Sequence, residues 1–144
     1  MIEQLFQTSR APFIVVRDGQ LHVDGAAHAQ LTVQIHEIAP VRKLFVQRRL
    51  ECYSLDCQTG KKGQFCELCP DRRRCGQRLQ LRLVWTDAGQ SRPAILEVPK
   101  PGFHAFDELL RQAGSVEDLL KALVEVTASQ TPDGRTELQF RLLF

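Results

Sequence analysis

The sequence predicts a mainly β fold with one helical segment, which places the protein in the α+β class. Three observations predict it. Short segments of alternating apolar and polar residues recur along the chain, turn residues separate them, and an extended helical spacing of apolar residues occurs once, in the C-terminal half. With 144 residues, 43% of them hydrophobic and 25% charged, residues 1–144 have the composition of one soluble globular domain.

The chain is expected to start with a short helical turn followed by a β-hairpin. The apolar residues of segment 2–6 have helical spacing, but Pro12 limits a helix there to about two turns. Asp18 and Gly19 then separate two segments of strand character, and Asp-Gly is among the strongest short-range hairpin signals. We therefore predict strands at 13–17 and 20–23.

Alternation of apolar and polar residues predicts further half-buried strands. They fall at 31–36, 43–50, 78–86 and 94–98. In the third of these, leucines alternate with Arg78, Gln80 and Arg82, so these three polar residues should share the face opposite the core. Trp85 continues the leucine face, and core packing is its expected role.

The C-terminal part combines a helical segment with a closing hairpin. Apolar residues at 103–113 follow helical spacing, and Gly114 is a natural helix stop. Ser115, with Asp118 three residues later, resembles a capping box that opens a short second helix through Leu123. The last residues predict a hairpin of two strands, at 124–129 and 136–143.

This order of elements indicates a small antiparallel barrel that carries a cysteine-rich insertion at about 52–78. The best-known barrel of this size that binds nucleic acids is the five-stranded OB type. We therefore expect one OB-like domain with a metal-binding insertion.

All five cysteines lie within 24 residues, in the pattern Cys52-x4-Cys57-x8-Cys66-x2-Cys69-x5-Cys75. An odd number excludes a complete disulfide framework within one chain. The Cys66-x2-Cys69 pair has the spacing of a metal-binding knuckle, and Cys75 is close enough to be a third ligand. The fourth ligand is Cys52 or Cys57. Four thiolates favour a structural zinc ion, which would stabilise a segment that has few apolar residues.

An iron–sulfur cluster is the alternative cofactor. Residues 65–75 resemble the Cys-x2-Cys-Pro-x4-Cys ending of cluster-binding helicase–nuclease exonucleases. Those enzymes also carry a nuclease motif on a large α/β domain. A short, β-rich chain is not expected to contain such a domain. A catalytic metal is disfavoured, because no His-x-Glu or His-Glu-x-x-His pattern occurs.

The formal net charge of +2 conceals a strong segregation. Segment 42–82 has eleven basic and four acidic residues and carries +7, whereas the rest of the chain carries −5. Clustered positive charge is typical of a polyanion-binding surface, although the same residues could instead form a solvated face that offsets the thiolates. The expected phosphate contacts are Arg42, Lys43, Arg48, Arg49, Lys61, Lys62, Arg72, Arg73, Arg74, Arg78 and Arg82.

Aromatic residues supply the second expected kind of contact, because proteins that bind single strands stack bases on aromatic rings. Phe45, Tyr53 and Phe65 lie within the basic segment and are the stacking candidates. No nucleophile elbow or glycine-rich phosphate loop is present, and the four histidines have no partner at catalytic spacing. We therefore expect no catalytic centre.

The expected location is the cytoplasm, without membrane association. The longest apolar runs, such as 13–16, are too short to span a bilayer, and the first residues lack the basic-then-apolar pattern of an export signal. Clustered thiols are also typical of a reducing compartment.

The region around the cysteine array resembles the small zinc-containing, OB-like single-stranded DNA-binding proteins of phages and mobile elements. The resemblance spans about residues 40–113 and rests on Cys52-Tyr-Ser-Leu-Asp56, the Cys-x2-Cys-Pro knuckle, a further cysteine and the alternating strand after it. It implies an OB-like fold, single-stranded DNA as ligand and Cys52 as the fourth zinc ligand. Cys57 stands where that family usually has glycine.

These observations predict a non-enzymatic protein that binds single-stranded nucleic acid, DNA in particular, through a basic groove and a structural zinc loop. Other proteins of a DNA-processing complex are further expected partners. One alternative is a protein-interaction or scaffold subunit, in which the metal loop and the acidic C-terminal half dock a partner. The other is an accessory factor that depends on an iron–sulfur cluster.

Overall fold

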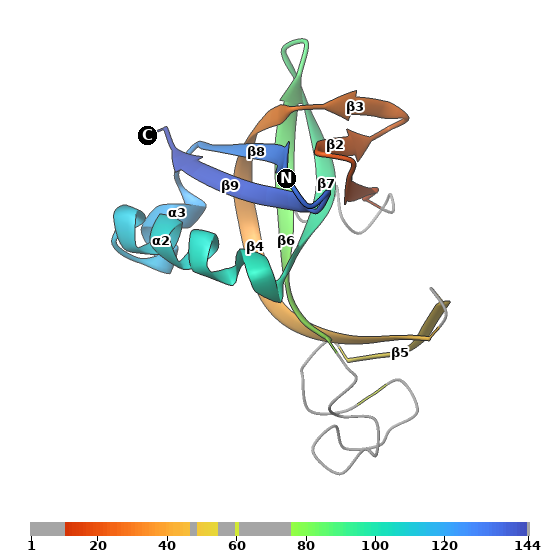
Figure 1. Cartoon of the computed structure of the whole chain (residues 1–144). Coiled ribbons are helices and arrows are strands. Elements are labelled where there is room, and N and C mark those ends of the chain that lie inside the picture. Colours follow the sequence, from red (N-terminus) through yellow and green to blue (C-terminus); the bar gives the residue numbers. More distant parts are fainter. Residues whose placement is uncertain (1–10, 47–48, 55–59, 61–75, 144) are drawn as a thin grey trace.

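The computed structural model describes residues 11–46, 49–54, 60 and 76–143 (Figure 1). For Arg42 and for residues 44–46 and 49–54 it describes the backbone alone. In this part of the chain one sheet curls into a half-barrel, and the helices pack beside it. The strands are β1 (Phe13–Arg17), β2 (Gln20–Val23), β3 (Ala26–His28), β4 (Gln30–Val46), β5 (Arg49–Ser54), β6 (Gly76–Asp87), β7 (Gln90–Pro99), β8 (Val124–Gln130) and β9 (Thr136–Leu142).

The sheet has nine strands in the order β3-β2-β1-β7-β6-β4-β8-β9, and β5 pairs with the end of β4. The predicted mainly β class with a helical segment is confirmed. One pair departs from the predicted antiparallel arrangement, because β1 and β7 are parallel, with Phe13 opposite Ile95. Parallel neighbours need a long connection, and the chain from β2 to β6 provides it.

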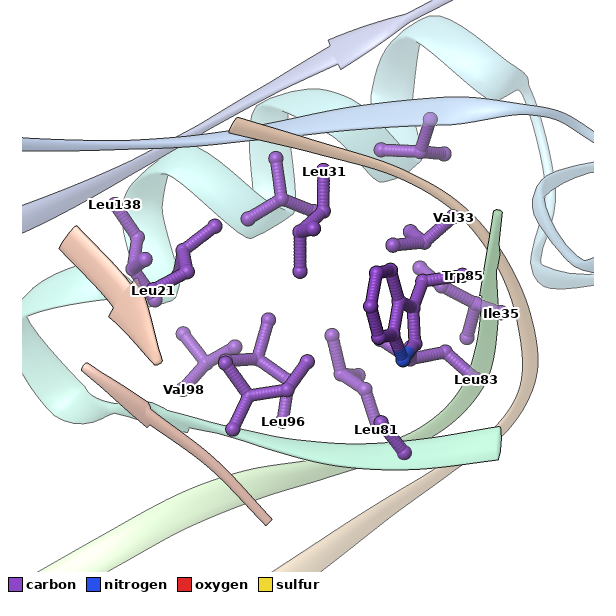
Figure 2. Close-up of a cluster of buried hydrophobic side chains, with 14 of the residues drawn as sticks. Leu21, Leu31, Val33, Ile35, Leu81, Leu83, Trp85, Leu96, Val98 and Leu138 are labelled. Carbon is purple, nitrogen blue, oxygen red and sulfur yellow. The ribbon is translucent and has the colours of Figure 1, made fainter. Parts of the chain in front are cut away.

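Side chains on the inner face of the sheet form the core. Figure 2 shows Leu81, Leu83 and Trp85 of β6 gathered with Leu96 of β7 and Val33 of β4. All five side chains are at most 2% exposed, so Trp85 has the core role that alternation predicts. Burying one large apolar side chain contributes about 1.5–3 kcal/mol, which is why the alternating pattern determines the face that turns inward.

The helical segment packs against β9. After the 3-10 turn η3 (Lys100–Gly102), helix α2 (Phe103–Ala113) has the predicted bounds and ends at Gly114, whose φ of 96° favours glycine. Phe106 of α2 is 2% exposed and meets Phe140 edge-on, with ring centroids 5.5 Å apart. This aromatic contact joins the helix to the last strand.

Helix α3 (Val116–Leu120) begins as predicted. The Ser115 hydroxyl caps it by accepting a hydrogen bond from the Asp118 N–H at 3.1 Å. The prediction that this helix continues through Leu123 is wrong. The chain must already be extended at Val124, which pairs with Val33 of β4, so no room is left for another helical turn.

Strand β4 is longer than predicted. The strands predicted at 31–36 and 43–50 are divided differently in the structure, since β4 runs to Val46 and β5 begins at Arg49. A β-bulge places one extra residue, His36, in the middle of β4. The bulge shifts the alternation by one residue, which explains why the sequence pattern is interrupted there.

The first hairpin, β1 and β2, has the predicted bounds, whereas the short β3 was not predicted. The turn between β1 and β2 contacts β9, at the other end of the strand order, because the Gly19 N–H donates a hydrogen bond to Thr136 Oγ1 at 2.9 Å. Gly19 has a φ of 72°, and a Cβ there would lie 3.1 Å from the Gln130 backbone. Glycine is therefore required for this approach. The helical turn predicted at 2–6 lies outside the described residues.

Candidate nucleic-acid interface

The outer face of the sheet is the side of β1, β7, β6 and β4 that points away from the core. Residues opposite each other in neighbouring strands share a face, as do residues two apart along a strand. On β6, the buried Leu81 and Leu83 therefore alternate with Arg82 on the outer face. By strand register the outer face includes Phe13, Val15, Glu37, Lys43, Arg78, Gln80, Arg82, Val84, Ile95 and Glu97.

One row of residues crosses this face through four strands. Phe13 of β1 is opposite Ile95 of β7, and Ile95 is opposite Arg82 of β6. Arg82 is in turn opposite Glu37 of β4, and Arg82 Nε lies 3.6 Å from Glu37 Oε2. These two charged side chains are 39% and 61% exposed. The row therefore places an aromatic ring, an apolar residue and an exposed ion pair side by side.

A second group on the outer face is formed by charges that are largely buried. Lys43 Nζ donates a hydrogen bond to Glu97 Oε1 at 2.7 Å and lies 2.6 Å from Glu97 Oε2, and the two side chains are 13% and 11% exposed. Arg78 approaches the same carboxylate at 3.9 Å. The Lys43 ammonium also lies over the Phe13 ring, 5.1 Å from its centroid. Two cations thus share one carboxylate beside an aromatic ring.

The predicted phosphate and stacking contacts are distributed over three regions. Arg78 and Arg82 lie on the outer face, each near a carboxylate, and the Lys43 ammonium is held by Glu97. The backbones of Arg42, Phe45, Arg49 and Tyr53 lie on β4 and β5. The remaining predicted residues lie outside the described part of the chain, namely Arg48, Lys61, Lys62, Phe65, Arg72, Arg73 and Arg74.

Lys43 is the point at which both ends of the cysteine-rich segment are attached to the sheet. It is opposite Tyr53 of β5 on one side of β4 and opposite Gly76 of β6 on the other. Neighbouring strands lie about 4.8 Å apart, so the backbones of Tyr53 and Gly76 are about 10 Å apart. Figure 1 shows this end of β4 and β6 extending past helix α2. The sheet therefore brings the two ends of segment 54–75 close together.

The predicted zinc ligands lie in and next to this segment. Cys52 belongs to β5, where its backbone is opposite Leu44 of β4. Cys57, Cys66, Cys69 and Cys75 lie outside the described residues. Within the described ranges, no group of three or more His, Cys, Asp or Glu side chains is arranged to hold a metal ion.

Two residues of the outer face, Glu97 and Phe13, were not predicted from the sequence. Glu97 was unremarkable because its cation, Lys43, is 54 positions away in the chain. Phe13 begins an apolar run, Phe-Ile-Val-Val, that suggests a buried segment. In a strand, successive side chains point to opposite faces, and the turn at Asp18 identifies 13–17 as a strand. Accordingly, Ile14 is 6% exposed on one face of β1, and Phe13 is 48% exposed on the other.

His36 is the bulge residue of β4. Burial lowers its pKa below the usual 6.5, because desolvation disfavours the imidazolium. Its Nε2 atom is buried, and the described part of the chain offers it no hydrogen-bond partner. A neutral imidazole in such a position is not suited to contact phosphate.

Comparison of the chain with protein-family models, with curated proteins and with solved structures found no match. In the ranges that the structure describes, the helices are all too short or too polar to cross a membrane.

Proposed function

We propose that the protein binds single-stranded nucleic acid, DNA in particular, on the outer face and on the basic segment attached to it. One observation carries this proposal. The segment with charge +7, residues 42–82, starts on β4 and ends on β6, and Tyr53 and Gly76, which flank its residues 54–75, are both opposite Lys43. This attachment would concentrate the positive charge of the segment near one end of the outer face, as a polyanion-binding surface requires.

The strand order supports the same proposal. Strand β4 pairs with both β6 and β8, and helix α2 lies between β7 and β8 in the chain. This order fits an OB-like barrel with β4, β6, β7, β8 and β9 as its five strands. Ligands of such barrels bind across the second and third strands and the loop between the first and second. Here these are β6, β7 and the cysteine-rich segment.

Zinc is the metal that fits the cysteines of this segment. Thiolates are the ligands of structural zinc, and Cys66, Cys69 and Cys75 would hold it together with Cys52 or Cys57. The attachment of both segment ends beside Lys43 would help to bring ligands that are distant in the sequence to one ion. Bound zinc would contribute folding energy to a segment with little apolar content, and so hold its arginines beside the outer face.

Metal analysis tests the zinc proposal. The purified protein is expected to be colourless and to contain about one zinc ion per chain. The double variant C66S/C69S should lose the metal, and a comparison of C52S with C57S should identify the fourth ligand by its loss of zinc. A brown protein that absorbs near ~400 nm would instead show an iron–sulfur cluster.

A salt titration tests nucleic-acid binding. The wild type should bind labelled single strands with an affinity that falls steeply with salt, because each phosphate contact contributes a slope of about −0.7 in log K against log salt. The variant R78Q/R82Q should have a slope shallower by about 1.4. The matched control is R111Q/R141Q, which removes two arginines that are both 69% exposed and lie outside the interface. Absence of binding, or an affinity that does not change with salt, would refute the proposal.

A further inference from the structure

The outer face of β1 carries two large apolar side chains that are open to solvent. Phe13 and Val15 are each 48% exposed. Strand β1 is paired on both sides, with Phe13 opposite Ile95 of β7 and Val15 opposite His22 of β2. The exposure of these residues is therefore a property of an inner strand of the sheet, where the backbone is held in place, and it makes them a candidate contact surface.

The charges around Phe13 indicate the kind of ligand. The Lys43 ammonium lies over the ring, 5.1 Å from its centroid, and Phe13 as a whole is 48% exposed. Arg82 lies two strands away in the same row, at about 10 Å for a strand spacing of about 4.8 Å. An aromatic ring with cations on the same face suits a base attached to a phosphate backbone better than a purely apolar protein segment.

We infer that Phe13 is a stacking platform for one base of the bound single strand. The base would lie on the side of the ring opposite the Lys43 ammonium, and the backbone would run toward Arg82. Glu97 is a positioning residue in this arrangement, because its carboxylate holds the Lys43 ammonium over the ring. The inference rests on the proposed function and extends its surface to β1, a strand outside the five of the proposed barrel.

Affinity measurements with a matched control test the platform. Stacking contributes about 1–3 kcal/mol per base, so F13A should bind oligo-dT roughly 5- to 160-fold more weakly than the wild type. The salt slope should stay unchanged, because no charge is removed. The control is V116A, which truncates a residue that is also 48% exposed but lies on α3. If the wild type binds and F13A binds equally well, the platform is refuted while the proposed function stands. If the wild type does not bind, both fall.

Fluorescence gives a second measurement that does not depend on a loss of affinity. The natural chain has one tryptophan, Trp85, which is 2% exposed. In F13W the added indole should be quenched when oligo-dT or oligo-rU stacks on it, whereas V116W should respond no more than the wild type. Quenching of F13W with retained affinity supports the platform. Binding without any change in the F13W emission overturns it.

Discussion

Replacing Leu96 with alanine is expected to lower the free energy of unfolding by about 2–5 kcal/mol. Leu96 is 0% exposed and lies in the middle of β7. Its register partners on the inner face are Ile14 of β1 and Leu81 of β6, both buried. The alanine would leave a cavity between three strands that are fixed by their hydrogen bonds, so the surrounding side chains cannot easily fill it.

Urea unfolding followed by the fluorescence of Trp85 measures this loss. The matched control is L123A, because Leu123 is the same kind of residue but is 43% exposed. Truncation at that surface position should change the free energy of unfolding by about 0.5 kcal/mol or less. A loss for L96A no larger than that for L123A would show that β1, β7 and β6 do not enclose Leu96.

Removing the carboxylate of Glu97 is expected to destabilise the protein by about 3–5 kcal/mol. Glu97 and Lys43 are 11% and 13% exposed, so E97A would leave a desolvated ammonium without its counter-charge and close to Arg78. The double variant K43M/E97M removes both charges and should recover most of the lost stability, because apolar residues of similar volume replace a buried ion pair at little cost.

The exposed pair Lys121 and Glu117 supplies the control. Its charged atoms are 3.5 Å apart, but the side chains are 73% and 81% exposed. Exposed pairs contribute about 0–1 kcal/mol, so E117A should have a small effect that high salt reduces further. If E97A and E117A cost the same, or if K43M/E97M is as unstable as E97A, the outer-face pair is not a buried ion pair in solution.

Local signals predicted the elements whose ends they mark. Asp18 marks the first hairpin turn, Gly114 ends α2, and Ser115 opens α3, each through chemistry within a few residues. The pairing of β1 with β7 left no such signal, because register between distant strands is set by the assembled core. The bulge at His36 shifts the alternation within β4, so the two predicted segments did not appear as one strand.

The candidate site was predictable to the same extent. Alternation along β6 placed Arg78 and Arg82 opposite the core, since this depends only on neighbouring residues. Which carboxylate meets Lys43 depends on strand register between β4, β6 and β7, so Glu97 could not be identified from the sequence. Phe13 was hidden for a related reason, because its exposure depends on what covers each face of β1.

The parallel pairing of β1 with β7 has a consequence for the order of folding. Residues 13–17 leave the ribosome long before residues 90–99, and until then β1 has only its hairpin partner β2. An isolated two-stranded hairpin is marginally stable in water. The contact between Gly19 and Thr136 spans 117 positions and forms later still. The first hairpin therefore cannot join the sheet until β7 has been synthesised, and pairings between segments so far apart in the sequence form slowly.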